Sequence, residues 1–429
     1  MMRSLRRATL VAALVAVSAL GACTEELRTS ATCPGLCPGQ QVPILDTVID
    51  PAVVLDTTVQ PFPVLGGESS LLLAARGDTL DVRAVVRFDT LPRKYSPIND
   101  TLTAIALVDS ATLAVQLKRT GASLPATIFL DAYDVTDTVA ADSAPLALLP
   151  YFTPARRLGS VQIDSTGFRD SLAVKIPLDT ALLRSIVTDT LRLLRIGLQL
   201  RAVGSAEVTV TGSTGGSSAP TLRYRASADT AVRALTARPF SKTPVTPIGL
   251  AGEFQDYLIV VRAPDATAAQ RFVVGGIPGH RSYLRFDLPS WLTDSVAVLT
   301  AKLELTQEPI RGIDPGRTFV VRAHVGLGAW ELTDLNRAAR LLAPLGTFIT
   351  DSLVLAPGDS GIKRLEMNGV IRQWRTVNGR RAVPSVLILR PEIEGVSGLA
   401  ARFYGTDAAP ALRPRLRVSY VPAIRYGQP

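Results

Sequence analysis

A short strand pattern occurs twice in the chain, and it constrains the fold more than any other feature. The two copies are Val85–Pro92 and Tyr283–Pro289, each with an Arg-Phe-Asp core that runs into Leu-Pro or Thr-Leu-Pro. In both copies alternation places the Phe on one face and the Arg and Asp on the other, which is typical of a strand with one buried face. The repetition predicts two copies of one β-rich domain.

The segments that follow each copy support this interpretation because they recur in the same order. Further short apolar segments lead to one amphipathic helix, predicted at 179–188 in the first copy and at 368–377 in the second. Each copy then closes with an Ala-Pro segment, at 219–224 and at 409–420. The sequence therefore predicts an all-β fold of two tandem antiparallel β-sandwich domains, jelly-roll-like, each with one short helix.

These patterns divide the chain into six parts. We predict a signal peptide at 1–22, a tether at 23–44, a first sandwich at 45–226, a connection at 227–254, a second sandwich at 255–422 and a tail at 423–429.

The N-terminus has the pattern of an export signal. Arg3, Arg6 and Arg7 precede an apolar run from Ala8 to Leu20, which is too short to span a bilayer as a permanent helix. The small residues that follow, and then Cys23, resemble the lipobox of bacterial lipoproteins. That resemblance implies that the chain is cut before Cys23 and that this cysteine carries the lipid. The alternative is a simple secretory signal with a chance cysteine.

The resemblance also implies a location. Thr24 follows the cysteine, where many Gram-negative lipoproteins of the inner membrane have Asp. We therefore expect a cell-envelope protein held on the outer membrane of a Gram-negative bacterium, with the membrane as a partner through the N-terminal lipid. Each buried methylene of the acyl chains contributes about 0.8 kcal/mol to anchoring.

Two further cysteines, Cys33 and Cys37, lie in the predicted tether. In an exported protein such a close pair could form a disulfide or remain as free thiols. A metal site would need two more soft ligands nearby, and the nearest histidine is His280. We predict no metal site and no cofactor.

The charge of the chain does not indicate a nucleic-acid partner. The formal net charge of +9 includes the three arginines of the leader, and the other arginines are scattered among acidic residues. A nucleic-acid binder would cluster its basic residues on one face. A bias in composition toward arginine explains the balance better than a polyanion site.

The sequence contains few side chains in a pattern that indicates catalysis. His280 and His324 are the two histidines, and both are expected at the surface. The acidic groups at 46, 50 and 56 and at 131, 134 and 137 match no dense calcium loop and are expected to be solvated, with a structural calcium ligand as the alternative. We predict that the protein is not an enzyme.

The second copy resembles the DNRLRE-type domains, an extracellular bacterial and archaeal family grouped with carbohydrate-binding modules. The resemblance covers 257–422 and depends on segments at 283–288, 301–305, 330–331, 370–374 and 409–420. It implies a non-catalytic β-sandwich of the cell surface. The first copy matches more weakly, because it lacks counterparts to Trp330 and to the helix residue Trp374.

Exposed aromatic rings are the side chains on which sugars stack. Trp291, Trp330 and Tyr283 are the candidates for a ligand site, whereas Trp374 falls on the apolar stripe of its helix and is expected in the core. We expect modules that bind a polysaccharide or another envelope protein. The alternatives are a structural spacer of the envelope without a small ligand, and a hydrolase that uses two carboxylates.

Overall fold

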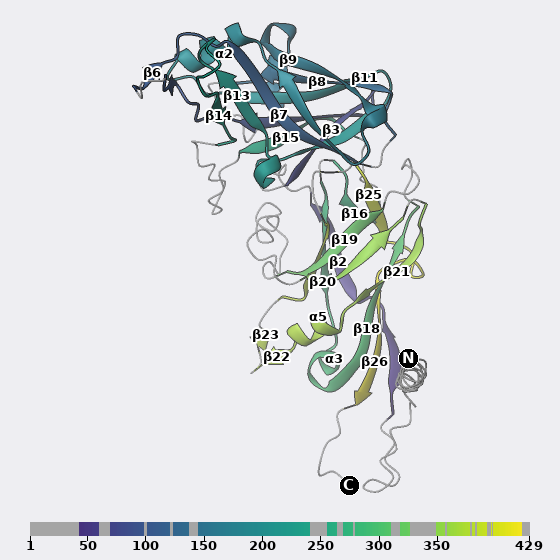
Figure 1. Ribbon diagram of the computed structural model, residues 1–429. Coiled ribbons are helices and arrows are strands. Elements are labelled where there is room, and N and C mark those ends of the chain that lie inside the picture. The colour runs from purple at the N-terminus through teal and green to yellow at the C-terminus, as the bar shows by residue number, and fades with distance from the viewer. Residues whose placement is uncertain are drawn as a thin grey trace, which may run out of the picture.

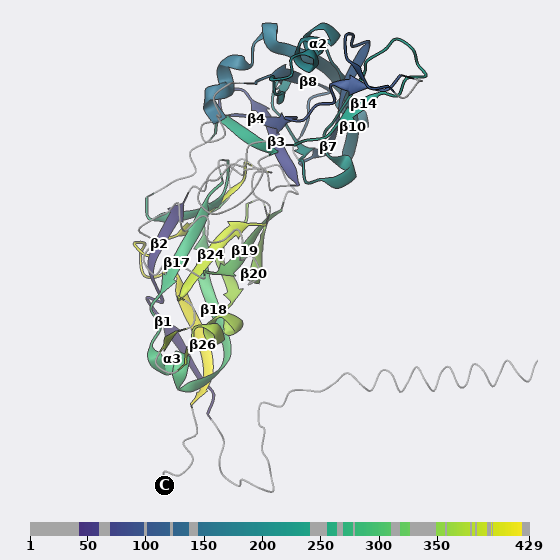
Figure 2. The ribbon, with the colours of Figure 1, turned by 90° about the vertical axis from the view of Figure 1, so that its left-hand side faces the viewer.

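The computed structural model consists of two β-rich units stacked end to end (Figures 1 and 2). The residues that the structure describes are 43–59, 69–97, 101–120, 123–136, 145–240, 255–263, 269–277, 279–309, 318–326, 349–356, 358–377, 380–381, 384–392, 396 and 398–422. We call the unit built from β3 to β15 unit 1, and the unit built from β1, β2 and β16 to β26 unit 2. Among the described residues, no helix is long and apolar enough to cross a membrane.

Unit 2 is a sandwich of two antiparallel sheets. The first runs in the order β1 (Leu45–Ile49), β26 (Arg415–Pro422), β18 (Val296–Gln307), β25 (Ala400–Tyr404) and β16 (Arg271–Gly275), with β21 (Gly361–Glu366) paired to β18. The second runs β2 (Val53–Val59), β17 (Arg281–Phe286), β24 (Val386–Pro391), β19 (Phe319–Val325) and β20 (Ile349–Leu355). The core lies between them: Phe272 and Phe403 come from the first sheet, and Leu284 and Phe286 come from the second.

Unit 1 is one continuous antiparallel sheet that bends around its own core. Its order is β14 (Leu235–Ala237), β13 (Thr221–Arg225), β7 (Ser110–Arg119), β12 (Ala206–Thr211), β3 (Ser70–Arg76), β4 (Leu80–Arg87), β11 (Arg195–Ala202), β8 (Thr127–Asp134) and β9 (Arg157–Asp164). Two strands lie off this path, β10 (Ser171–Pro177) on β7 and β15 (Asp256–Arg262) on β4. Burial alternates along β7, whose inward residues Ala111, Leu113, Val115 and Leu117 enter the core. The predicted all-β fold of two antiparallel units is confirmed.

A bridge between Gly159 and Leu178 brings the first residues of β9 to the end of β10, so that the bent sheet nearly closes on itself. The approach is close enough that a Cβ built on Gly159 would lie 2.0 Å from the carbonyl oxygen of Pro177. Only glycine fits at this position.

The two units share one pattern of strand pairing. In unit 1, β12 pairs with β3 and β7, β11 with β4 and β8, β13 and β10 with β7, and β8 with β9. Unit 2 repeats each of these pairings in the same order: β25 pairs with β16 and β18, β24 with β17 and β19, β26 and β21 with β18, and β19 with β20. The hairpin of β3 and β4 corresponds in unit 2 to a single bridge between Gly275 and His280.

In chain order the two repeats are β1–β13 and β14–β26. The first two strands of each repeat lie in the unit that the rest of the other repeat builds. Strand β1 pairs with β26 and β2 pairs with β17, so both belong to unit 2 although they precede unit 1 in sequence. In return, β14 pairs with β13 and β15 pairs with β4 in unit 1. The registers of the second exchanged strands correspond: Asp56 lies opposite Leu284, and Asp256 lies opposite Val86. Unit 1 is therefore inserted within unit 2, with reciprocal exchange of two strands.

This exchange corrects the predicted domain boundaries. The segment from residue 45 to Val59 was assigned to the first sandwich, but its strands complete the second. The segment 227–254 was expected to be a connection that could include an opening strand; its strand β14 completes the first sandwich, as does β15 beyond it. The boundaries were wrong because edge strands are short and amphipathic, and such patterns do not specify which sheet they join.

The two predicted helices are present. Helix α2 (Thr180–Thr188) begins at Asp179, whose carboxylate accepts a hydrogen bond of 2.8 Å from the backbone nitrogen of Leu182. Helix α5 (Asn368–Gln373) ends at Trp374, which is fully buried against Phe286 with ring centroids 5.0 Å apart. The prediction that Trp374 belongs to the core is confirmed. Unit 2 has a further short helix, α3 (Ser290–Asp294).

The Arg-Phe-Asp core is buried on both faces in unit 1. Phe88 lies in the main core as expected, but Arg87 and Asp89 are also buried and form an ion pair of 2.6 Å. The outer face is covered because Phe240 forms a bridge with Phe88 and its carbonyl oxygen accepts a hydrogen bond from the backbone nitrogen of Asp89.

Candidate functional site

The structure does not gather the predicted site residues into one place. Cys23, Cys33, Cys37 and Trp330 lie outside the described residues. Trp291 belongs to α3, whereas Tyr283 lies on β17. Lipid attachment at Cys23 and the pairing of Cys33 with Cys37 stay predictions.

Tyr283 is not available for stacking on a ligand, which corrects its assignment as an exposed side chain. The side chain points away from the main core, as predicted, but only 2% of the residue is exposed. It forms a small apolar cluster with Val59, Val386 and Ile388, and its direct cross-strand neighbour on β24 is Ile388. The apolar neighbours on the outer face of the sheet bury the ring.

Trp291 is half-buried. Its ring packs against Tyr420 of β26, with centroids 4.9 Å apart and planes inclined by 46°, and it contacts the edge of the core of unit 2. This contact fixes the ring at the end of unit 2 where β1 and β26 also lie. Trp291 thus has a packing role that the sequence pattern did not indicate.

Of the acidic groups at 131, 134 and 137, the first two are buried with different partners, and residue 137 lies outside the described residues. Asp131 is buried and accepts hydrogen bonds from Arg201 and from Ser160. Burial alone would raise the pKa of Asp131, but the hydrogen bonds from Arg201 and Ser160 hold it below its ordinary value. Asp134 is also buried and lies 2.6 Å from Arg192. The expectation of solvated side chains was therefore wrong for these two residues, because neighbouring arginines compensate their burial.

Both histidines are buried as well, contrary to the expectation that they lie at the surface. His324 is 2% exposed, and its Nε2 accepts a hydrogen bond of 3.1 Å from Nε of Arg390. His280 is 8% exposed, with Nδ1 3.1 Å from the carbonyl oxygen of Gly275. Within the described ranges, no three His, Cys, Asp or Glu side chains lie close enough to hold a metal ion.

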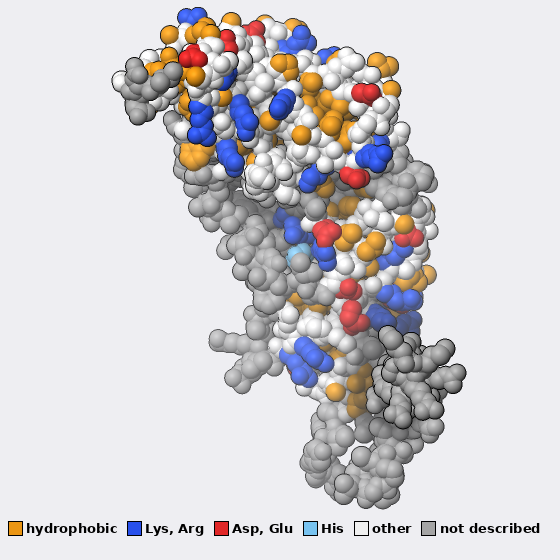
Figure 3. Space-filling view, viewed as in Figure 1, with side chains coloured by type: hydrophobic (Ala, Val, Ile, Leu, Met, Phe, Trp, Pro, Cys, Tyr) orange, Lys and Arg blue, Asp and Glu red, His pale blue; other side chains and the backbone are white. Residues whose placement is uncertain are grey.

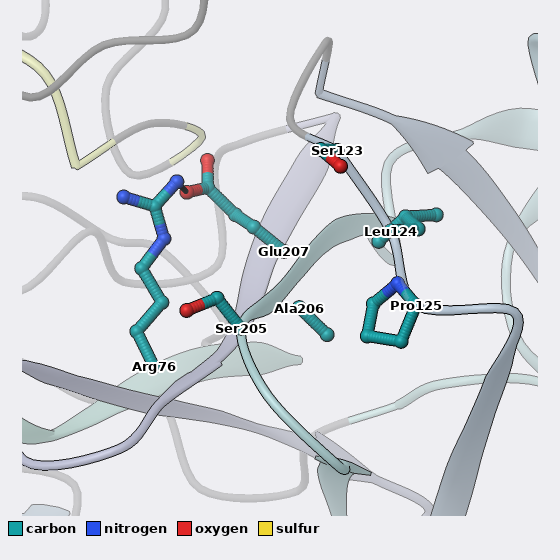
Figure 4. Close-up of a pocket in the computed structure, with 7 residues that line it drawn as sticks. All are labelled: Arg76, Ser123, Leu124, Pro125, Ser205, Ala206 and Glu207. Carbon is teal, nitrogen blue, oxygen red and sulfur yellow. Dashed lines mark ion pairs between the residues drawn. The ribbon is translucent and has the colours of Figure 1, made fainter.

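A polar pocket with a buried ion pair lies at the end of β3 and β12, and it contains none of the predicted residues. Its volume is about 420 Å³, and it is lined by Arg76, Ser123, Leu124, Pro125, Ser205, Ala206 and Glu207. We call it the Arg76 pocket. Figure 4 shows the guanidinium of Arg76 facing the carboxylate of Glu207, with the Ser205 hydroxyl beside them and Leu124 and Pro125 on the opposite wall.

The ion pair of this pocket is arranged by the sheet. Glu207 lies opposite Ala74 in the antiparallel β3–β12 ladder, so Arg76, two residues further along β3, is its diagonal neighbour. Their terminal atoms are 2.8 Å apart, with 2% of the Glu207 side chain and 29% of the Arg76 side chain exposed. In the described structure, the buried Nε of Arg76 has no hydrogen-bond acceptor. An unsatisfied buried donor costs about 1–3 kcal/mol.

The chemistry of the pocket is that of hydrogen-bonding recognition. The guanidinium donates, the carboxylate accepts, and the hydroxyls of Ser123 and Ser205 can do both. Leu124 supplies an apolar contact. The volume lies in the range of small-molecule sites, about 300–1,000 Å³. No pattern in the sequence indicates this pocket, because its two charged residues come from strands far apart in the chain.

A second hollow lies between the two units. It measures about 470 Å³, and its lining includes Lys118, Arg119 and Thr120 from unit 1 and Thr318, Phe319 and Glu392 from unit 2. A third pocket, of about 360 Å³, lies beside α3 and α5 and is lined by arginine and aliphatic side chains. No pair of carboxylates lines any of these three pockets, each of which holds at most one Asp or Glu.

Comparisons with known proteins add little to this geometry. No family model and no curated protein matches the chain. Among solved structures, it is similar to a VP2 subviral particle of infectious bursal disease virus, with 10% identity, 84% of this chain and 78% of that chain covered, and a TM-score of 0.13. It is similar to N-glycanase F (PNGase F), with 9% identity, coverage of 89% and 96%, and a TM-score of 0.14.

A third similar structure is the CBM22-1–CBM22-2 tandem domain of Paenibacillus barcinonensis Xyn10C, with 9% identity, coverage of 89% and 99%, and a TM-score of 0.11. Similarities with TM-scores this low carry no argument about function. The fold assignment depends on the strand pairing alone, and the resemblances to lipoproteins and to DNRLRE-type domains stay predictions.

Proposed function

We propose that the chain is a non-enzymatic, lipid-anchored protein of the cell envelope that binds a glycan in the Arg76 pocket. The anchor is Cys23, on the outer membrane of a Gram-negative bacterium, and binding uses no cofactor. Because Leu45 lies opposite Tyr420, the tether leaves unit 2 at the end farther from unit 1. This arrangement would hold unit 1 and its pocket away from the membrane.

The ion pair of Arg76 and Glu207 is the observation that supports the proposal. A charged pair with one member buried costs desolvation free energy and is weak evidence for a stabilising role. A ligand with several hydroxyl groups would hydrogen-bond to the exposed part of the Arg76 guanidinium and to the hydroxyls of Ser123 and Ser205. Sugars have this chemistry, and a monosaccharide fits a volume of about 420 Å³.

A pocket-filling variant tests the proposal. Ser205 is exposed, so Ser205→Leu should fill the pocket without disturbing the ion pair. The chain from residue 24 onward, which retains every described residue, would be applied to a glycan array, and the affinity for any hit measured by calorimetry. We expect a glycan ligand whose affinity falls at least about tenfold in the variant, or about 1.4 kcal/mol.

Ser217→Leu is the matched control, because Ser217 is also exposed in unit 1 but lies outside the pocket. It should leave the affinity unchanged. Glycan arrays without a hit would exclude a glycan ligand. An envelope protein that the wild-type chain pulls down and the Ser205→Leu variant does not would instead be identified as the ligand. A blank result in both assays would remove the binding function.

The anchor is tested separately. Metabolic labelling with palmitate should mark the wild-type chain and should not mark Cys23→Ser, which we expect in the soluble fraction. A labelled Cys23→Ser chain would exclude Cys23 as the acylated residue.

The end-to-end arrangement of the units also suits a spacer without a small ligand (Figures 1 and 2). If this second function were correct, Ser205→Leu would restore the envelope of a deletion strain as fully as the wild-type gene. A glycan-binding protein would fail to do so with this variant.

A further inference from the structure

The outer face of the first sheet of unit 2 has a cluster of basic side chains around one buried carboxylate. Glu304 of β18 is 2% exposed and is contacted by three arginines. Nε of Arg415 lies 2.8 Å from its Oε2, and the Nε atoms of Arg364 and Arg417 lie 3.1 and 3.4 Å from its Oε1. We call these four residues, together with Lys302, the arginine face.

The strand register arranges this face in two rows. Glu304 lies between Arg415 on β26 and Arg364 on β21, and Lys302 lies between Arg417 and Glu366 on the same two strands. The rows are two residues apart, or about 7 Å. In Figure 3, Lys and Arg side chains gather at the right-hand edge of unit 2.

The arginines are not neutralised by their carboxylate. The two acidic groups, Glu304 and Glu366, face three guanidinium groups and Lys302, and 56% of the Arg364 side chain and 52% of the Arg417 side chain are exposed. All three contact Glu304 through Nε, and in the described part of the chain their Nη nitrogens make no hydrogen bond. These nitrogens can donate to the oxygens of an acidic ligand.

Unit 1 shows that the fold does not require the buried carboxylate. The matching registers place Ala114 where unit 2 has Glu304 and Thr221 where it has Arg415, whereas Lys175 and Arg223 stand where unit 2 has Arg364 and Arg417. The same sheet position therefore forms in unit 1 without a buried charge. A buried carboxylate that only one of two equivalent units has, and whose burial costs desolvation free energy, indicates a role other than stability, such as holding the arginines for binding.

We propose that the arginine face of unit 2 binds an acidic polysaccharide whose carboxylate groups pair with the guanidinium groups. A polymer suits the two rows of basic groups, because several weak ion pairs then act together. The site is distinct from the Arg76 pocket, and it extends the proposed function to a second glycan of defined charge. The buried Glu304 holds the arginines in place and does not contact the ligand.

The test uses polygalacturonate as the acidic probe and dextran as the neutral one, with the chain from residue 24 onward. Arg364→Gln combined with Arg417→Gln leaves Arg415 paired with Glu304, so that the fold is retained. We expect wild-type chain to bind polygalacturonate and not dextran, with an affinity that falls at least about tenfold in the double variant and falls with added salt.

Arg184→Gln combined with Arg233→Gln is the control, since it removes the same charge from exposed positions of unit 1. An equal loss of affinity in this control would overturn the site, because net charge alone would then explain binding. Tighter binding to phosphatidylglycerol vesicles than to polygalacturonate would assign the face to a lipid surface and overturn the polysaccharide. Ser205→Leu should leave polygalacturonate binding unchanged, so failure of the two proposed sites can be told apart.

Discussion

Asp56 accepts a hydrogen bond of 2.5 Å from the backbone nitrogen of Thr406, a residue that lies near the other end of the chain. Asp56 belongs to β2, which precedes unit 1 in sequence, and Thr406 follows β25 of unit 2. Asp256 of β15 makes the corresponding contact in unit 1, accepting from the backbone nitrogen of Ser213 after β12. The carboxylate of each exchanged strand thus forms a hydrogen bond with a turn of the unit that the strand joins.

The first prediction follows from this contact. Asp56→Ala removes the acceptor of a partly buried backbone N–H, so we expect the free energy of unfolding of unit 2 to fall by about 1–2 kcal/mol. Hydrogen exchange should show faster exchange in unit 2 and unchanged exchange in unit 1. Asp46→Ala, at an exposed position of β1, is the control and should have a smaller effect. Equal destabilisation of both units would argue against the strand exchange.

The second prediction concerns acid sensitivity at Glu304. Burial alone would raise the pKa of Glu304, but hydrogen bonds from Arg364 and Arg415 hold it below its ordinary value. A lowered pKa means that the carboxylate contributes stability above its unfolded pKa, and that this contribution is lost as pH falls through the folded pKa. Glu304→Gln should therefore be less stable than wild type at pH 7.

Urea unfolding at a series of pH values measures the difference. It should begin to shrink as the pH falls below about 4.3, where the carboxylate of the unfolded chain takes up a proton, and should vanish once the pH is below the folded pKa. A difference that does not change with pH would show that the charge of Glu304 contributes nothing to stability.

The third prediction concerns Asp256, for which stability should change with pH in the opposite direction. Burial raises the pKa of Asp256, although hydrogen bonds from Ser213 oppose the shift. A raised pKa means that stability is fully present below the unfolded pKa and declines as pH rises through the folded pKa. Asp256→Asn keeps an acceptor oxygen, so its stability relative to wild type should improve as pH rises from 3 to 8. Thermal unfolding across that range checks the direction, and a decline would contradict it.

The fourth prediction tests the closure of unit 1. A Cβ at position 159 would meet the carbonyl oxygen of Pro177, so Gly159→Ala should lower the free energy of unfolding by about 1–3 kcal/mol. Gly167→Ala is the control, because nothing lies within 4 Å of its added Cβ. Equal stability of the two variants would mean that β9 and β10 are not held this closely.

The sequence predicted the parts of the fold that depend on local pattern. The alternation around Phe88 and Phe286 marks two equivalent core strands, and the stripe that ends at Trp374 marks a buried helix end. The strand exchange could not be predicted, because the alternation in β1 and β2 specifies a buried face and not a partner sheet. A leucine at position 45 suits either unit.

The candidate sites could not be predicted from the sequence, for a related reason. Exposure of Tyr283 was predicted from its direction, and that direction was correct, but apolar neighbours on the same outer face bury the ring. Arg76 with Glu207, and Glu304 with its three arginines, come from strands far apart in sequence. Only the register of the ladders brings them together.

The strand exchange is tested most directly by the folding of unit 2 with and without its two N-terminal strands. We predict that residues 265–429 alone do not unfold cooperatively in a thermal melt, and that fusing residues 43–59 to them through a flexible linker restores a cooperative transition. A cooperative transition of residues 265–429 alone, at the same temperature as that of the fusion, would contradict the account.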